Sequence, residues 1–366
     1  MGLWRIIMMT VLAITGLAIF YLSYRLGRFS FLKNNPKKLR FFGGAFFVVL
    51  GFSLIGVFFN FINAIVCIIY LTLISLICDF ILWLYQKLCR KKLKHDWAFP
   101  VAVLLTFLAL SLGWYNAHHV WQTDYKIQTD KNIQNMKIAM FADAHIGTTF
   151  DANGFAEHIQ KIQSQNPDIV IIAGDFVDDD TTRPDMIKSV EALGKIQPPK
   201  GIYFVFGNHD KGYYGAKHRG FSGQDLIETL IKNGIKVLRD ETVLIDDSLY
   251  IIGRKDKSQS RQSIFELISK LDQDKYMLVI DHQPTDYENL ESAGVDLVLS
   301  GHTHGGQLFP FNKVSQWLKI NDKTYGYERR GKTDFIVTSG ISDWAIRFKT
   351  GTQSEYVIIE LSEKEQ

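Results

Sequence analysis

The chain has 366 residues, enough for two domains, and its 41 basic and 38 acidic side chains nearly balance. The two signs are unevenly distributed, since residues 1–123 hold 12 Lys or Arg and two acids, while the remainder holds 29 basic and 36 acidic residues. The acidic C-terminal part lacks the positive field typical of nucleic-acid binding, so we expect no nucleic-acid partner. All three cysteines precede residue 90, which excludes a disulfide framework and a cysteine-ligated zinc site.

Four apolar runs precede residue 124, and each is about as long as the ~20 residues that a helix needs to cross a bilayer. They are Leu3–Tyr24, Phe41–Phe59, Ala64–Leu84 and Trp97–Tyr115. The first run lacks the features of a signal peptide, and three more runs follow it. The alternative interpretation is that the runs form buried core helices of a soluble protein. Three of the runs, however, have almost no polar stripe along the helix. We therefore predict a four-helix transmembrane region over residues 1–123.

The basic residues of this region gather in two loops, whereas the link Asn60–Asn63 is uncharged. The first loop contains Arg25, Arg28, Lys33, Lys37, Lys38 and Arg40, and the second contains Lys87, Arg90, Lys91, Lys92 and Lys94. Loops rich in Lys and Arg remain in the cytoplasm. We therefore predict a multi-pass cell-membrane protein whose N-terminus, and everything after Trp121, lie outside the cytoplasm.

One acid, Asp79, falls inside the third apolar run, where a charge is costly in hydrocarbon. An ionisable residue within a membrane span is usually functional. Asp79 therefore supports the alternative of a polytopic sensor or transporter whose soluble domain is accessory. Asp79 lies near the cytoplasmic end of the run, however, and has no obvious charged partner in another span. We expect it to face the bundle or to extend towards the membrane surface.

Residues 124–136 are polar and unpatterned and are predicted to be a linker, after which strands and helices alternate through residues 137–366. The expected strands are Lys137–Ala142, Asp168–Ala173, Gly201–Phe206, a hairpin of Val243–Asp246 and Leu249–Gly253, Tyr276–Ile280, Asp296–Leu299, Phe335–Thr338 and Tyr356–Leu361. The expected helices are Asp151–Ser164, Pro184–Leu193 and Gln224–Asn233. This alternation predicts a layered α/β domain, and the hairpin with the late strands predicts a mixed sheet.

Polar residues follow directly after five of the expected strands. The motifs are Asp143-x-His145, Gly174-Asp175-x-x-Asp178, Gly207-Asn208-His209-Asp210, Asp281-His282 and Gly301-His302-x-His304. Taken alone, Asp143 and His145 fit a metal pair, a catalytic pair or a capping turn, and each motif is acceptable turn chemistry. Functional sites form just past the carboxyl ends of strands in open α/β sheets. Five such turns at one edge therefore predict a functional site.

Together these motifs resemble the calcineurin-like metallophosphoesterase superfamily, over roughly residues 137–361. The following Gly305-Gly306-Gln307 resembles its membrane-anchored bacterial branch, in which some relatives cleave UDP-diacylglucosamine or other phosphodiesters. The resemblance implies a mixed-sheet αββα sandwich and a metal-dependent phosphohydrolase that acts on a phosphomonoester, a phosphodiester or a pyrophosphate. A catalytically silent metal-binding scaffold of a membrane complex is the alternative. It is disfavoured because no position of the motif set is missing.

The resemblance also implies a role for each motif residue. The metal ligands would be Asp143, His145 and His304 for one ion, Asn208, His282 and His302 for the other, and Asp175 between them. This mixture of oxygen and imidazole donors suits Mn, Fe or Zn, and two such ions can clamp the attacking and leaving oxygens of a phosphoryl transfer. His209 would stabilise the transition state or protonate the leaving oxygen. Asp178 and Asp210 would orient the ligands.

Substrate contacts have weaker signals in the sequence. Arg254 and Arg347 follow or precede expected strands, and a guanidinium can hold phosphate oxygens in a bidentate manner. The segment Phe309–Tyr327 is rich in aromatic residues, which are typical of membrane interfaces. Only a short stretch separates Tyr115 from the first expected strand, so we predict a lipid-linked phosphate or pyrophosphate as substrate. In the alternative interpretation, the segment only packs on the sheet and the spans only tether the domain.

Overall fold

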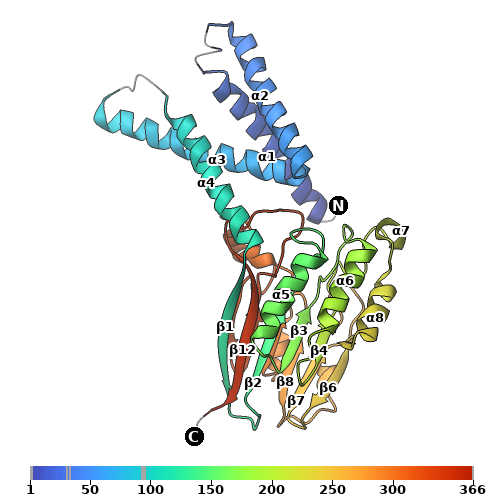
Figure 1. Cartoon of the computed structure of the whole chain (residues 1–366). Coiled ribbons are helices and arrows are strands. Elements are labelled where there is room, and N and C mark those ends of the chain that lie inside the picture. The colour runs from blue at the N-terminus through green and yellow to red at the C-terminus, as the bar shows by residue number, and fades with distance from the viewer. Residues whose placement is uncertain (1–2, 30–31, 33, 92–95, 365–366) are drawn as a thin grey trace. The chain divides into compact units, whose positions relative to one another are not determined.

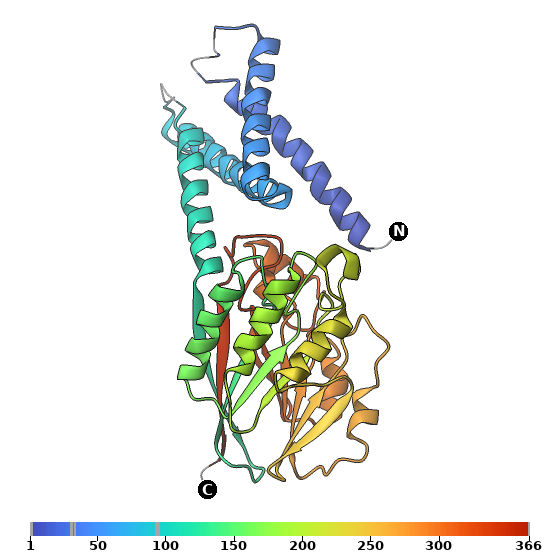
Figure 2. The same cartoon turned by 45° about the vertical axis from the view of Figure 1, so that its right-hand side comes forward.

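The structure of the chain, a computed structural model, describes residues 3–29, 32, 34–91 and 96–364 (Figures 1 and 2). Three lysines of the predicted basic loops, Lys33, Lys92 and Lys94, lie outside the described residues. The chain divides into two compact units, Met1–Leu112 and Gly113–Gln366. The first unit holds most of the apolar helices, and the second holds all the described strands.

Four helices are long and apolar enough to cross a membrane, as predicted. They are α1 (Leu3–Leu26), α2 (Lys37–Phe58), α3 (Phe61–Cys89) and α4 (Ala98–His118). At most 33% of any candidate span is buried within the chain, so most of their apolar side chains point outward. Side chains that face lipid have this arrangement, because hydrocarbon surrounds the helix in place of water.

Asp79 does have a charged partner, which the sequence analysis missed. Arg25, at the end of α1, is buried, and its guanidinium lies 2.8 Å from Asp79 and 2.5 Å from Asp96. The Tyr21 hydroxyl donates a second hydrogen bond to Asp79, at 2.7 Å. From the sequence Arg25 is expected in a loop, but α1 continues past Tyr24 and brings Arg25 to α3. Asp79 therefore joins α1 to α3, and the observation that favoured a transporter has a structural explanation.

The second unit contains two six-stranded sheets packed face to face. The first sheet has the order β1-β12-β2-β3-β4-β5, and the second has the order β10-β11-β9-β8-β7-β6. The strands of the first sheet are β1 (Val120–Thr129), β2 (Met136–Phe141), β3 (Ile169–Ala173), β4 (Ile202–Val205), β5 (Ile235–Val237) and β12 (Ser354–Glu363). Those of the second are β6 (Glu241–Ile245), β7 (Leu249–Gly253), β8 (Tyr276–Ile280), β9 (Leu297–Ser300), β10 (Gly326–Arg330) and β11 (Thr333–Val337). Both sheets mix parallel and antiparallel pairs, as predicted.

Helices cover the outer faces of both sheets and complete an αββα sandwich. Figure 1 shows α5, α6 and α8 along the first sheet. The helices of this unit are α5 (Ala152–Ser164), α6 (Arg183–Gly194), α7 (Ala216–Arg219), α8 (Gly223–Lys232), α9 (Ile264–Ile268), α10 (Tyr287–Ser292), the 3₁₀ turn η1 (His304–Gly306) and α11 (Phe311–Trp317). Alternate residues of β2 serve two cores: Ala139 and Phe141 pack under the helices, whereas Ile138 and Met140 pack between the sheets. Because both faces are covered, the strand is apolar apart from Lys137.

The predicted linker over residues 124–136 is wrong for its first half. Val120–Thr129 form β1, which pairs in parallel with β12 from Val120 opposite Ser354 to Thr129 opposite Glu363. β1 lies at the edge of the sheet, and Gln122, Asp124 and Lys126 are exposed. Edge strands often carry polar and charged residues, which block pairing with other chains. That composition resembles a linker, so the sequence pattern alone did not reveal the strand.

Candidate metal centre

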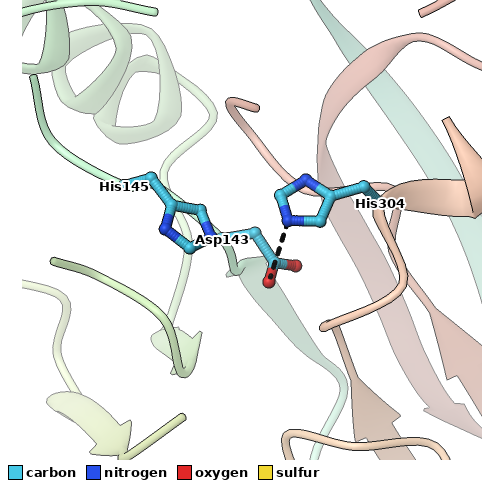
Figure 3. Close-up of side chains that lie close together, drawn as sticks. All are labelled: Asp143, His145 and His304. Carbon is cyan, nitrogen blue, oxygen red and sulfur yellow. Dashed lines mark ion pairs between the residues drawn. The ribbon is translucent and has the colours of Figure 1, made fainter. Parts of the chain in front are cut away.

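The carboxyl ends of parallel strands bring the predicted site residues together. β2, β3 and β4 run parallel in the first sheet, and β8 and β9 run parallel in the second. The polar residues that follow these strands form two groups, and within each group the potential ligand atoms lie within 4.8 Å of one another. The groups are Asp143, His145 and His304, and Asp175, His282 and His302. Figure 3 shows the first group, where His304 Nε2 lies 3.9 Å from Asp143 Oδ1.

Asp175 lies between the two groups. Its Oδ2 atom is 3.0 Å from Nε2 of His282 and 3.9 Å from Nε2 of His145, which belongs to the other group. Its Oδ1 atom accepts a hydrogen bond from the His209 backbone at 2.8 Å, which brings the neighbouring Asn208 to the site. A single carboxylate thus contacts donors of both groups.

The donor atoms of these residues fit divalent metal ions. Within the described part of the chain, several buried side-chain atoms at the site lack a hydrogen-bond partner. They are Nε2 of His145, Oδ1 of Asn208 and Nδ1 of His304. Leaving a buried polar atom unpaired costs about 1–3 kcal/mol, so native proteins rarely tolerate it without a ligand. Imidazole nitrogens beside carboxylate and amide oxygens are the donors that Mn, Fe and Zn accept.

The backbone of the site is held in an unfavourable conformation. Five potential ligands have φ in the left-handed region, where residues with a Cβ atom are uncommon. They are Asp143 (56°), His145 (36°), Asp175 (51°), His302 (71°) and His304 (48°). Such strain gathers at functional sites, because the surrounding structure enforces the geometry that the chemistry needs.

Two glycines allow the turns to approach one another. A Cβ atom at Gly207 would lie 2.1 Å from Oδ1 of Asp175, and one at Gly301 would lie 2.6 Å from Oδ2 of Asp143. Real Cβ contacts are never this short, so any side chain at either position would displace a carboxylate. These glycines are needed for close approach of the backbone to the site.

Burial and neighbouring charges shift the pKa values of the site. Burial raises the pKa of Asp143 to about 6 and lowers that of His302 to about 4. Burial also lowers the pKa of His304 well below its ordinary value. For Asp175, burial acts in the raising direction, but the imidazoles of His282 and His145 outweigh it and hold the pKa below its usual range. For His145 and His282, burial acts in the lowering direction, but Asp178 and Asp175 outweigh it and raise the pKa of these two rings. Metal ions bind neutral imidazoles, so ions at this site would displace protons from His145 and His282.

Two further acids brace the ligand turns. Both oxygens of Asp210 accept backbone hydrogen bonds, and the donors are the N–H groups of Asp175, Phe176, Val177 and Gly207, at 2.7–3.1 Å. Asp178 Oδ2 lies 3.2 Å from Nδ1 of His145. Asp210 therefore holds the turn that carries Asp175, and Asp178 orients the ring of His145.

The predicted substrate contact Arg254 has a different role. Its side chain is 2% exposed, and its guanidinium lies 2.8 Å from Asp281 and 2.9 Å from Asp286. Arg261 pairs with the same Asp281 at 2.9 Å. Parallel pairing of β7 with β8 places Arg254 beside Asp281, 27 residues further along the chain. The sequence gives no sign of this pairing. Two carboxylates occupy the guanidinium, and Arg254 anchors the turn that carries His282.

His209 lies next to the site but outside both donor groups. Its half-buried ring is 5.1 Å from the ring of His145, and the rings of Tyr213 and Trp344 also border it, at 5.1 and 5.2 Å. Burial lowers the pKa of His209. Arg347 is half-buried in the loop between β11 and β12, which also carries Trp344. No local sequence pattern singles out Tyr213 or Trp344, so neither residue was predicted.

Comparison with known proteins decides the family. The family model for calcineurin-like phosphoesterase matches residues 136–306. A metallophosphoesterase of Aquifex aeolicus is 31% identical over 215 residues, which cover 56% of this chain and 78% of the relative. The chain belongs to the calcineurin-like phosphoesterase family. Membership implies a hydrolase of phosphoesters that depends on divalent metal ions.

Two other members of the family give further comparisons. A metallophosphoesterase of Helicobacter pylori is 28% identical over 247 residues, which cover 66% of this chain and 63% of the relative. A Danio rerio protein described as a transmembrane protein with a metallophosphoesterase domain is 26% identical over 282 residues, covering 72% of this chain and 62% of that protein. The four membrane helices of this chain and the description of the Danio protein agree on membrane association.

Proposed function

We propose that the protein is a membrane-anchored dinuclear metallophosphoesterase that hydrolyses a phosphoester or pyrophosphate outside the cytoplasm. The observation that carries the proposal is the pair of donor groups that share Asp175. A structural metal site needs one closed set of ligands. Two adjacent sets, with a carboxylate between them at the carboxyl ends of the strands, instead suit a pair of catalytic ions.

The proposal assigns every ligand residue to one ion, except Asp175, which is assigned to both. Asp143, His145 and His304 hold one ion, Asn208, His282 and His302 hold the other, and Asp175 binds both. When bound, two divalent ions supply Lewis-acid activation of the phosphoryl group and of the attacking water. Whether the bound ions are Mn, Fe or Zn depends on which metals are available to the protein as well as on the donor atoms.

His209 acts directly on the substrate in this proposal. The reaction joins a water oxygen to phosphorus and breaks the bond between phosphorus and the leaving oxygen, which then needs a proton. The ring of His209 borders His145 without joining either donor group. In its protonated form this ring can donate a proton to the leaving oxygen, and the pKa that burial lowers makes the imidazolium a stronger acid. Trp344 and Tyr213 keep the ring in place.

The full-length chain, purified with added Mn²⁺, is expected to hydrolyse bis(4-nitrophenyl) phosphate and to contain two metal ions per chain by elemental analysis. Chelation with EDTA should remove the activity, and Mn²⁺ should restore it. Two bound ions without any hydrolysis of mono-, di- or pyrophosphate esters would instead establish the silent scaffold. Fewer than one ion per chain would contradict both functions.

We also propose that the centre faces away from the cytoplasm and acts on a lipid-linked phosphate or pyrophosphate. The orientation rests on the concentration of Lys and Arg in the loops after the first and third spans, and the substrate class rests on the aromatic segment Phe309–Tyr327. Alkaline phosphatase fused after Gln366 is expected to be active, and green fluorescent protein at the same position is expected to be dark, because the first folds only outside the cytoplasm. The same reporters fused after Arg40 should give the opposite result and serve as the control. Fluorescence from the C-terminal fusion would reverse the orientation.

A further inference from the structure

The segment that follows η1 exposes its apolar side chains and buries a polar one. Its exposed members are Phe309 (56%), Phe311 (45%), Trp317 (82%), Leu318 (58%) and Ile320 (54%), which we call the α11 apolar surface. In the same segment Asn312 is 6% exposed, and its amide donates a hydrogen bond to the Gly351 carbonyl at 3.2 Å. Water-soluble domains favour the reverse arrangement, and an exposed patch of this kind marks a contact with a membrane or a partner.

The α11 apolar surface is bonded to the end of a membrane helix through one short loop. The backbone N–H of Phe309 donates to Oγ1 of Thr350 at 3.0 Å. The neighbouring Lys349 donates its backbone N–H to the Gly113 carbonyl at 2.8 Å, and its own carbonyl accepts from Asn116 at 3.3 Å. Gly113 and Asn116 belong to the last two turns of α4, a candidate membrane span. The surface therefore lies beside the point where the chain leaves the bilayer.

Aromatic and basic residues near this point have the composition of a membrane interface. Trp114, Tyr115 and Trp121 are 45%, 48% and 37% exposed. Tryptophan and tyrosine concentrate where a membrane meets water, since their rings are amphipathic. Two exposed lysines, Lys313 and Lys319, lie within or beside α11. Apolar and basic residues combined on one exposed segment favour binding to anionic lipid.

The metal centre contacts the same two segments as the α11 apolar surface, namely the loop that carries Lys349 and the turn η1. A Cβ atom at Gly340 would lie 2.8 Å from Asp143, and Lys349 Nζ donates to the Gly340 carbonyl at 3.4 Å. Lys349 therefore connects α4 to Gly340, which borders the metal ligand Asp143. On the other side, α11 packs against η1, because a Cβ atom at Gly306 would lie 2.5 Å from Asn312. The donor groups therefore occupy the end of the catalytic unit that carries the aromatic belt.

We propose that the α11 apolar surface inserts into the bilayer interface and that substrates reach the metal centre along the membrane plane. The second part rests on the hydrolase function proposed above; the first part stands without it. The occupant of the surface is the lipid bilayer, because a membrane helix and an aromatic belt adjoin the surface. A substrate phosphate at headgroup level then meets the donor groups without leaving the membrane.

Quenching by brominated lipid tests the insertion. Full-length chains with Cys67, Cys78 and Cys89 changed to serine receive one new cysteine, by Trp317→Cys or by Phe265→Cys, and a bimane label. Phe265 lies on α9 and is 48% exposed, so it is a matched control for an exposed aromatic position. In vesicles of brominated phosphatidylcholine and phosphatidylglycerol, the label at 317 is expected to be quenched and the label at 265 to keep its intensity. Equal intensity at the two positions would overturn the proposal.

Kinetics test the route of the substrate. Phe311→Ser with Trp317→Ser should lower the ratio of kcat/KM for a lipid-linked phosphoester to kcat/KM for its water-soluble analogue about tenfold, which corresponds to about 1.4 kcal/mol. Phe265→Ser should leave this ratio at the wild-type value. An unchanged ratio in the double variant would overturn the membrane route. Absence of hydrolysis of either substrate would contradict the hydrolase function, and the quenching result would still decide whether the surface inserts.

Discussion

Asp175→Asn is expected to remove both metal ions and to reduce phosphoester hydrolysis to the background rate. The Asp175 carboxylate contacts imidazoles of both donor groups, so one substitution alters both sites. Asparagine keeps the shape of the side chain but removes its charge and replaces one oxygen with a donor group. The loss in metal affinity should exceed the ~10–100-fold that follows from loss of an outer-shell partner. Elemental analysis and hydrolysis of bis(4-nitrophenyl) phosphate measure the two effects.

Asp274→Asn is the matched control for this substitution. Asp274 is an exposed acid in the turn before β8, so its change should leave metal content and activity at the wild-type level. Circular dichroism of both variants separates loss of metal from loss of fold. An Asp175→Asn chain that keeps two ions per chain would contradict the shared position of this carboxylate.

His209→Ala is expected to lower kcat by ~10²–10⁴, the range for loss of an acid–base group, while metal content stays near two ions per chain. The ring of His209 borders His145, Tyr213 and Trp344 but belongs to neither donor group. The effect should be smaller on esters with good leaving groups, because such leaving oxygens need no proton. Comparing 4-nitrophenyl and alkyl esters of phosphate therefore tests the role as well as its size.

His218→Ala gives a matched histidine control. His218 lies on α7 and is exposed, 5.5 Å from the ring of Tyr214, so its loss should change kcat little. If His209→Ala loses metal instead of turnover, His209 is a ligand. If both esters slow equally, His209 does not protonate the leaving group.

The sequence predicted the donor groups well because their signals are local. Asp143 and His302 each follow an apolar strand within a few residues, so a short window shows both the strand and the polar turn. Parallel pairing of the strands then brings such turns to one edge, whatever the length of chain between them. The helices over 152–164 and 183–194 were predicted within two residues for the same reason: their apolar residues recur at helical spacing.

Features that depend on distant partners were not predictable in this way. Arg254 resembles a phosphate-binding arginine until its partners Asp281 and Asp286 are known. Asp79 lacked a partner in the sequence because Arg25 lies 54 residues away. The short strand Ile235–Val237 and the helix Tyr287–Ser292 were missed because so few residues show no clear period.

The position of β12 determines when the catalytic unit can assemble. β1 and β2 are successive along the chain, yet β12 lies between them in the sheet and pairs with both. During synthesis β12 emerges after all the other described strands, so until Ser354–Glu363 are available, β1 has no partner and β2 keeps an unpaired edge. Pairing across so many residues is also slow, because a long loop must close first. A ribosome that stops before residue 354 therefore releases a membrane-inserted chain whose sheet remains open, and such edges are prone to aggregation and proteolysis.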